Sequence, residues 1–178
     1  MISKHGMKKI LVIGSGGAGK STFSRHLGKI LNIEVIHLDT LYWNPGWIET
    51  PKPVWRNMVE ELIDKDSWII DGNYSGTLDI RVDACDTVIF LDIARLTCLW
   101  RVMKRVMLYR NGRRPDMTEG CRERLRLEFA RWIWNYPERT RPKVLKLLKD
   151  SSQSKNVVRL CNQADMDSFL IDIKKTTG

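Results

Sequence analysis

The chain has 178 residues, 43% of them hydrophobic and 29% charged, a composition typical of one globular domain with a substantial core. No apolar stretch approaches the ~20 residues of a membrane-spanning helix, and the apolar run at residues 10–13 is too short for a secretory signal. Cys85, Cys98, Cys121 and Cys161 form no CxxC pair, so neither a zinc site nor a disulfide framework is expected. These features predict a cytoplasmic protein that does not bind membranes.

The net charge of +9 is concentrated in one part of the chain. Residues 95–146 contain fifteen Lys and Arg against five Asp and Glu, a net charge of +10, whereas the remaining residues together carry −1. A concentrated positive field attracts polyanions, and phosphorylated metabolites, nucleotides and nucleic acids all fit this description. The charge therefore indicates an anionic partner without selecting its class.

Short apolar runs alternate with amphipathic segments along the chain. We expect strands at residues 9–13, 34–39, 67–71, 87–92 and 156–161. We expect an aromatic loop at residues 40–54 and helices at 21–31, 51–63, 94–110, 120–135, 142–149 and 165–173. This alternation predicts an α/β fold with a parallel, doubly wound sheet that helices cover on both faces. A single domain is expected over residues 1–178, with a core at 7–94 and 150–175 and a basic, Arg-rich helical lid at 95–149.

The most specific motif is GSGGAGKS at residues 14–21, which matches GxxxxGK[ST] between a predicted strand and a predicted helix. In such loops the main-chain N–H groups surround the phosphates, the lysine reaches the β and γ phosphates, and the hydroxyl after it ligates Mg²⁺. The pattern therefore predicts ATP and Mg²⁺ as cofactors, with Lys20 and Ser21 in these two roles. The predicted triphosphate-binding residues are Gly14, Ser15, Gly16, Gly17, Ala18, Gly19, Lys20, Ser21 and Thr22.

Two aspartates at predicted strand ends, Asp71 and Asp92, are candidates for a second contact to Mg²⁺. Asp92 superficially resembles a Walker B carboxylate, whereas Asp71 ends the third predicted strand. In nucleotide-kinase-like folds the third strand lies beside the phosphate-loop strand. We therefore favour Asp71, and we interpret Asp92 as a strand-terminal residue or a helix cap.

Further motifs carry a resemblance to a known family. They are residues 14–22, HLDTLYW at 37–43, DGNYSGT at 71–77, RPDM at 114–117 and WIWNYP at 132–137. At these positions the chain resembles the bacterial family labelled DNA topology modulation protein, or FlaR-like, which is similar to adenylate and shikimate kinases. The resemblance covers residues 8–150. It implies an α/β, three-layer P-loop NTPase fold of the nucleotide-kinase type, with a five-stranded parallel sheet, a mobile lid and an acceptor-binding region. Asn73-Tyr74 replaces the Phe-Pro of adenylate kinases, so their nucleoside-monophosphate contacts are not carried over.

Five residues are candidates for binding the acceptor of the phosphoryl group: Asp39, Trp43, Asn73, Tyr74 and Arg81. Asp39 ends a predicted strand, where some kinases of this class orient an acceptor hydroxyl, although capping a turn is an equally reasonable role. Trp43 belongs to an aromatic loop, whose rings would either stack against a flat acceptor group or pack beneath the loop itself. Arg81 would clamp an acceptor phosphate or serve a structural role.

The basic segment supplies candidates for closing over the phosphates. Arg114 follows the predicted turn at Asn111-Gly112, while Arg139 and Arg141 lie in a predicted loop between two helices. An arginine that approaches the γ-phosphate neutralises charge that develops in the transition state. We therefore assign Arg114, Arg139 and Arg141 to catalysis together with Lys20 and Asp39.

Two classes of function follow from the sequence. The first is an ATP-dependent phosphotransferase acting on an unidentified small molecule or nucleotide. The alternative is a nucleotide-binding regulator associated with DNA, which the basic segment and the family label favour; a simple NTPase switch is a third hypothesis. No helix-turn-helix or zinc-finger signature is present, so any nucleic-acid binding is expected to be weak and salt-sensitive.

Overall fold

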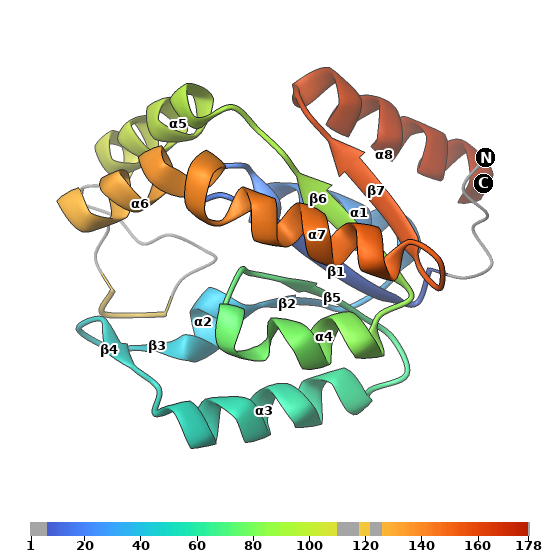
Figure 1. The fold of residues 1–178 in the computed structure, drawn as a ribbon, viewed down its shortest axis with the longest axis horizontal. Helices are drawn as coiled ribbons and strands as arrows, with labels where there is room; N and C mark the ends of the chain where they lie inside the picture. The colour runs from blue at the N-terminus through green and yellow to red at the C-terminus, as the bar shows by residue number, and fades with distance from the viewer. Residues whose placement is uncertain (1–6, 110–117, 122–125, 178) are drawn as a thin grey trace.

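The structure is a computed structural model that describes residues 7–109, 118–121 and 126–177. Its centre is a five-stranded parallel sheet in the order β2-β5-β1-β6-β7, which confirms the predicted fold class (Figure 1). The strands are β1 (Lys9–Gly14), β2 (Val35–His37), β5 (Trp68–Asp71), β6 (Thr87–Leu91) and β7 (Asn156–Leu160). As expected, β5 lies beside β1, with Asp71 level with Val12.

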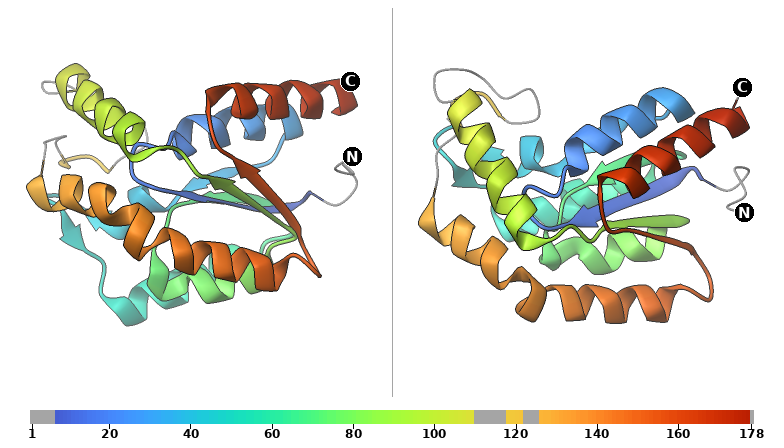
Figure 2. Two further views of the ribbon diagram at one scale, coloured as in Figure 1. Left: turned by 45° about the horizontal axis from the view of Figure 1, so that its top comes forward. Right: turned by 90° about the horizontal axis from the view of Figure 1, so that it is seen from above.

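Helices cover both faces of this sheet (Figure 2). On one face lie α1 (Lys20–Leu31), α5 (Arg95–Leu108) and α8 (Gln163–Thr177), and on the other lie α3 (Lys52–Asp64), α4 (Leu78–Ala84) and α7 (Arg141–Ser151). Alternate residues of β1 point into the two layers: Ile10 and Val12 pack with α1 and α8, while Leu11 and Ile13 pack with α3 and α7. Burial on both faces explains why the strands read as continuous apolar runs.

Several ordered elements lie in regions for which the sequence predicts neither a helix nor a strand. Residues 40–54 contain the end of α2 (Leu38–Tyr42) and a hairpin of β3 (Trp43–Asn44) and β4 (Ile48–Glu49), and a 3₁₀ turn at Ser75–Thr77 leads into α4. The Thr50 hydroxyl, which precedes α3, does not cap that helix and instead donates to the carbonyl oxygen of Tyr42 at 2.8 Å. The second and third sheet strands, β2 and β5, therefore both continue into ordered structure. Because β2 ends at His37, Asp39 lies in α2 and not at the end of a strand as predicted.

The basic segment differs in part from the predicted lid at residues 95–149. Helix α6 (Leu127–Arg139) continues through Pro137, and α7 starts at Arg141, so the chain breaks only at Thr140 rather than in a loop over 136–142. Val144 and Leu148 of α7 are buried against the sheet. Within the described residues, no helix combines the length and the apolar character that crossing a membrane requires.

Candidate functional site

The phosphate loop lies between β1 and the N-terminus of α1, and two helices of the basic segment flank it. Gly17 has φ 78°, and a Cβ there would lie 2.3 Å from the carbonyl oxygen of Cys98 in α5. Only glycine combines this backbone conformation with so close an approach. A Cβ on Gly16 would lie 2.5 Å from Cζ of Phe129, so α6 covers the loop from another side.

Lys20 is folded back against the loop. Its Nζ donates to the carbonyl oxygens of Gly14 and Ser15, each at 3.0 Å. Burial lowers the pKa of this ammonium group, and the negative charges of Asp39 and Asp71 oppose that shift. The lysine therefore lies between the loop and two carboxylates at the carboxyl edge of the sheet, where ligands bind in open α/β folds.

Asp71 ends β5 and is 3% exposed. Its Oδ2 lies 2.8 Å from Nδ1 of His37, which is its register neighbour at the end of β2. His37 has no role in the sequence-based predictions, although strands that end in His37 and Asp71 would bring the two together if paired. The pairing orients the carboxylate that we predicted as the Mg²⁺ contact.

Asp39 and Tyr74 form a second pair at this edge. The Tyr74 hydroxyl donates to Asp39 Oδ1 at 2.6 Å. Burial raises the pKa of Tyr74, and the adjacent Asp39 charge raises it further, so the phenol stays protonated and remains a hydrogen-bond donor. Two of the predicted acceptor-binding residues are thereby joined.

Asn73 connects the same loop to the phosphate site. Its Oδ1 accepts a hydrogen bond from the main-chain N–H of Gly14 at 3.1 Å. Residues 71–74 therefore contact β2, the phosphate loop and Asp39 within four consecutive positions.

Arg81 has a different place from the one the sequence suggested. The side chain is fully buried, and it donates to the carbonyl oxygens of Gly72, Asn73 and Tyr74 at 2.9 Å each. Its Nε donates to the carbonyl oxygen of Thr77 at 3.2 Å. The expected clamp on an acceptor phosphate is therefore corrected: Arg81 holds the loop at residues 72–74, because these buried carbonyl groups need donors.

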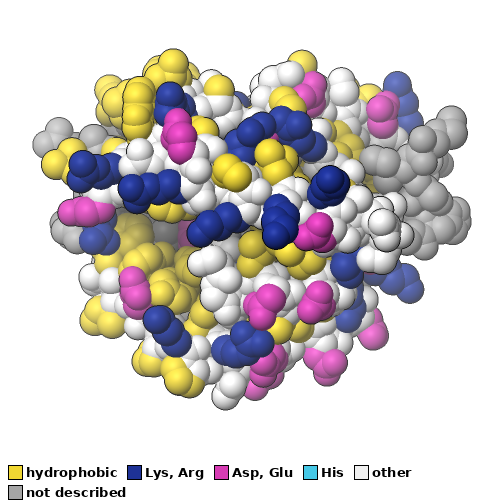
Figure 3. All heavy atoms as spheres, viewed as in Figure 1, with side chains coloured by type: hydrophobic (Ala, Val, Ile, Leu, Met, Phe, Trp, Pro, Cys, Tyr) yellow, Lys and Arg dark blue, Asp and Glu magenta, His cyan; other side chains and the backbone are white. Residues whose placement is uncertain are grey.

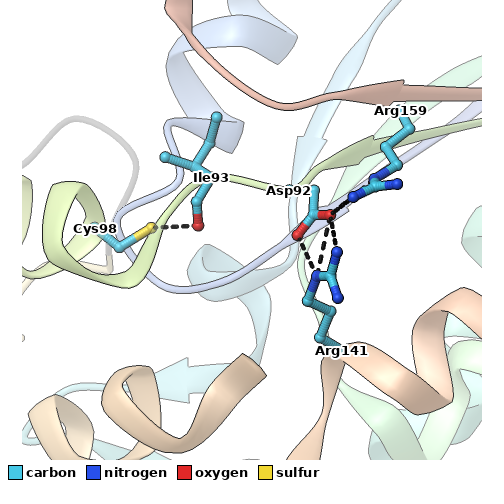
Figure 4. A network of polar contacts seen from close by, with 5 residues as sticks. All are labelled: Asp92, Ile93, Cys98, Arg141 and Arg159. Atoms are coloured by element: carbon cyan, nitrogen blue, oxygen red, sulfur yellow. Dashed lines mark hydrogen bonds and ion pairs between the residues drawn. The ribbon is translucent and has the colours of Figure 1, made fainter. Parts of the chain in front are cut away.

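Asp92 is engaged by two arginines (Figure 4). Arg141 Nε and Nη2 donate to Asp92 at 2.8 and 2.9 Å, and Arg159 Nε donates to it at 2.8 Å. Burial opposes ionisation of this carboxyl, but the hydrogen bonds from Arg141 and Arg159 outweigh it and lower the pKa of Asp92. Asp92 thus ties β6 to β7 and to the start of α7.

The structure does not place any of the three predicted lid arginines in the described cavity wall. Arg141 is committed to Asp92 and does not line the cavity beside the loop, which corrects its assignment to phosphate closure. Arg139 is exposed in the last turn of α6 and is likewise absent from the described cavity wall. Arg114 lies outside the described residues.

A cavity of about 790 Å³ brings the remaining candidates together. The phosphate loop contributes Lys20 and Ser21, and the sheet edge contributes Asp39 and Asp71. The wider lining includes Gly16, Gly17, Gly19, Thr22, Trp43, Trp47, Glu49, Asn73, Tyr74, Phe129 and Trp132. In the space-filling view a hollow with hydrophobic side chains on its floor lies below α6, with Lys and Arg side chains above it (Figure 3).

Four arginines that were not predicted as site residues also line this cavity: Arg25, Arg101, Arg105 and Arg126. Arg101 Nη1 donates to the carbonyl oxygen of Ala18 in the phosphate loop at 2.9 Å. A sequence signal exists for two of them. Arg101 and Arg105 follow Cys98 at spacings of three and seven, which places them beside the buried face of α5.

Comparisons with solved structures support the fold. The structure is similar to shikimate kinase from Bacteroides thetaiotaomicron, with a TM-score of 0.52 and 17% identity over 94% of this chain and 96% of that chain. It is also similar to shikimate kinase from Acinetobacter baumannii in complex with shikimate, with a TM-score of 0.57 and 17% identity over 96% and 92% of the two chains.

A third similar structure is deoxyadenosine kinase from M. mycoides with bound dATP, with a TM-score of 0.56 and 15% identity over 94% of this chain and 98% of that chain. No protein-family model and no curated protein matches the sequence. At these identities the likeness shows the fold alone, which is a P-loop kinase-like fold.

Proposed function

We propose that the protein is an ATP-dependent phosphotransferase. The observation that carries this proposal is the sharing of one cavity by the phosphate loop and by two carboxylates, Asp71 at the end of β5 and Asp39 in α2. A nucleotide switch needs the loop and a metal contact, whereas phosphoryl transfer also needs a group that orients the acceptor beside the γ-phosphate. Asp39 is that additional group.

The donor half of the site accommodates a magnesium nucleotide. In the described residues no three His, Cys, Asp or Glu side chains are arranged to hold a metal by themselves. Mg²⁺ in nucleotide sites takes only one or two protein oxygens and completes its shell with phosphate and water oxygens. The Ser21 hydroxyl and the Asp71 carboxylate fit that requirement, and the bound ion would neutralise charge on the phosphates.

Lys20 and Asp39 then have complementary roles. Lys20 leaves the carbonyl oxygens of Gly14 and Ser15 and binds the β and γ phosphates. The acceptor oxygen attacks the γ-phosphorus, the bond from that phosphorus to the bridging oxygen breaks, and ADP leaves with the electron pair. The hydroxyl proton passes to Asp39, which the Tyr74 hydroxyl keeps in position.

One arginine of α5 and one from the chain just before α6 neutralise the charge that develops during transfer. Arg105 and Arg126 line the same cavity as Lys20 and take the place of Arg139 and Arg141 in our scheme. Arg114 keeps its predicted role as a proposal. The donor is ATP, the acceptor is a small molecule, and we propose a cytoplasmic location for the reaction.

The DNA-associated alternative, which the resemblance to the topology modulation family suggests, has less support. Arg101, Arg105 and Arg126 line the cavity, and Arg141 is paired with Asp92. Other Lys and Arg side chains remain on the surface near α6 and α7, so we expect weak duplex DNA binding that disappears between low and physiological salt (Figure 3). Fluorescence anisotropy tests this, and tight, sequence-selective binding at physiological salt would reverse our preference.

The decisive experiment separates transfer from binding. The protein is incubated with γ-labelled ATP, Mg²⁺ and a panel of nucleosides, nucleotides and small metabolites, and we expect a labelled product. Asp39→Asn should slow transfer by about 10²- to 10⁴-fold, as expected for loss of a general base, while ATP affinity stays within about twofold. Asp172→Asn on the exposed face of α8 is the matched control. Release of labelled phosphate alone, with every acceptor tested, contradicts the proposal.

A further inference from the structure

The side of the cavity opposite the phosphate loop has a distinct composition. We define the acceptor end as Asp39, Trp43, Trp47, Glu49 and Tyr74, all of which line the cavity. They come from α2, from the β3–β4 hairpin and from the loop after β5. This end therefore consists of three aromatic rings and two carboxylates.

The rings form a braced wall. Trp43 and Trp47 meet edge to face with ring centroids 5.3 Å apart, and Tyr42 meets Trp43 edge to face at 5.1 Å. Tyr42 also lies 4.6 Å from Tyr74, and both of these rings contact the buried Trp55 at 5.1 Å. Because each ring is supported by another ring, the wall offers preformed flat surfaces to a ligand.

The charges at this end are negative. Asp39 and Glu49 line the cavity, and within residues 39–74, all of which the structure describes, no Lys or Arg does so. The cationic side chains of the described wall come instead from α1, α5 and the chain just before α6: Lys20, Arg25, Arg101, Arg105 and Arg126. Arg81, which we predicted as a candidate contact to an acceptor phosphate, instead donates hydrogen bonds to main-chain carbonyl groups.

From this juxtaposition we propose that the acceptor is an alcohol with a flat ring that is neutral or positively charged, and that phosphate monoesters and carboxylates are rejected. The inference rests on the proposed phosphotransferase function and specifies its substrate class. A ring stacks against Trp43 and Trp47, a hydroxyl lies toward Asp39, and a cationic substituent is attracted to Glu49. An anionic substituent near Glu49 would instead meet a like charge.

The reaction on such an acceptor balances without a further reagent. The alcohol oxygen forms a bond to the γ-phosphorus of ATP, the bond from that phosphorus to the bridging oxygen breaks, and Asp39 receives the proton. The products are the phosphate monoester of the alcohol and ADP. The product carries the phosphate charge that this end of the cavity disfavours, which promotes its release.

The test uses three ligands that share a benzyl alcohol ring and differ in one substituent. They are 4-(aminomethyl)benzyl alcohol, 4-methylbenzyl alcohol and 4-(hydroxymethyl)benzoate, titrated by ligand-observed NMR with Mg²⁺ and a non-hydrolysable ATP analogue. We expect the cation and the neutral compound to bind roughly tenfold or more tightly than the anion. Nucleosides paired with their 5′-monophosphates test the same order at larger size. Equal or tighter binding of the anionic member in both series overturns the inference.

Substitutions at Glu49, Trp43 and Trp47 test whether these residues determine the affinities of the three ligands. Glu49→Gln keeps an acceptor for the Tyr42 hydroxyl, which donates to Glu49 Oε2 at 2.9 Å, but removes the charge. The preference for the cation over the neutral compound should then disappear, while Glu61→Gln on the exposed face of α3 should preserve it. Trp43→Ala should weaken all three ligands and Trp43→Phe should restore them; Trp47→Ala supplies a second readout if Trp43→Ala does not fold.

The two proposals fail in different ways. If the anionic ligands bind most weakly, as expected, but no phosphorylated product forms, the result supports the ligand class and contradicts the phosphotransferase function. Phosphorylation of anionic acceptors in preference to the neutral and cationic ones supports the phosphotransferase and overturns the ligand class.

Discussion

The two ends of the cavity are built from different kinds of groups. At the donor end, the main chain of residues 14–21, Lys20 and the α5 arginines present positive charge to a triphosphate. At the acceptor end, rings and carboxylates from separate segments are held by side-chain contacts such as the Tyr74–Asp39 hydrogen bond. The donor end therefore depends mainly on backbone conformation, and the acceptor end depends on side-chain identity.

One loop joins these ends. Asn73 contacts the main chain of the phosphate loop, Tyr74 contacts Asp39, and Arg81 donates to the carbonyl groups of both. Substitutions should consequently fall into three groups: those that damage one end, those that damage both, and those that affect neither.

The largest effect on ligand binding is expected from Lys20→Ala at the donor end. Removing the ammonium group deletes a direct contact to the β and γ phosphates, and it also removes the positive charge that lies between these phosphates and the carboxylates of Asp39 and Asp71. ATP affinity should fall by about 100-fold or more, which corresponds to about 2.7 kcal/mol. Isothermal titration calorimetry with MgATP measures the change.

Lys29→Ala, at an exposed position on the same helix, is the matched control and should bind ATP like the unaltered protein. An unchanged ATP affinity in Lys20→Ala would disprove the phosphate-loop assignment itself.

The next effect, and the largest on stability, is expected from Arg81→Met. The change leaves the carbonyl oxygens of Gly72, Asn73 and Tyr74 without their buried donor, which should lower the free energy of unfolding by about 3 kcal/mol or more. Burial lowers the pKa of Arg81 to about 10, so the native side chain is charged at neutral pH.

Urea unfolding measures the loss, and both ATP and acceptor binding should weaken in the fraction that folds. Arg56→Met, which breaks a half-exposed pair with Glu60 on α3, should cost less than about 1 kcal/mol. If Arg81→Met loses no more unfolding free energy than Arg56→Met, Arg81 does not hold the loop at residues 72–74 as we infer.

The contrast between the ends also explains what could be predicted from the sequence. The donor end is one contiguous motif whose glycines and lysine have direct geometric meaning, and the strand that carries Asp71 was placed beside β1 correctly. The five sheet strands were found because burial on both faces makes each a continuous apolar run.

The rest required tertiary information. Helix α4 contains a buried Arg81, and a charged residue at a core position hides the helical period of so short a segment. The rings of the β3–β4 hairpin face the cavity only because the chain folds back at Gly46, and Arg141 meets Asp92 across 49 residues. Pro137 indicated a loop, yet α6 continues through it.

A smaller and one-sided effect is expected from Asn73→Ala. It removes the hydrogen bond to the Gly14 N–H at 3.1 Å, which helps to set the conformation of the phosphate loop. One such bond is worth about 0.5–1.5 kcal/mol, so ATP affinity should fall by roughly three- to tenfold. The anionic ligand should still bind more weakly than the neutral and cationic ones, because Asp39 and Glu49 are unaltered. A reversal of that order would show that the two ends are not separable.

The smallest effect is expected outside both ends, at the Asp92 network of Figure 4. Hydrogen bonds from Arg141 and Arg159 lower the pKa of Asp92 below its usual value of 3.8, so the folded state binds the proton less readily than the unfolded state. The stabilising contribution is therefore complete above about pH 5 and is lost as the pH falls through the folded-state pKa. Asp92→Asn should be about 1 kcal/mol less stable at pH 7.

Urea unfolding at several pH values tests the sign of this effect. The difference between the unaltered protein and Asp92→Asn should shrink steadily from pH 5 towards pH 3, because protonation makes Asp92 resemble the amide. Asp83→Asn, at an exposed position of α4, should show no such convergence. ATP affinity and acceptor order should both be unchanged in Asp92→Asn, since Asp92 does not line the cavity. A change in ATP affinity would instead show that Asp92 contributes to the donor end, and Asp92 would again be a candidate for the Mg²⁺ contact beside Asp71.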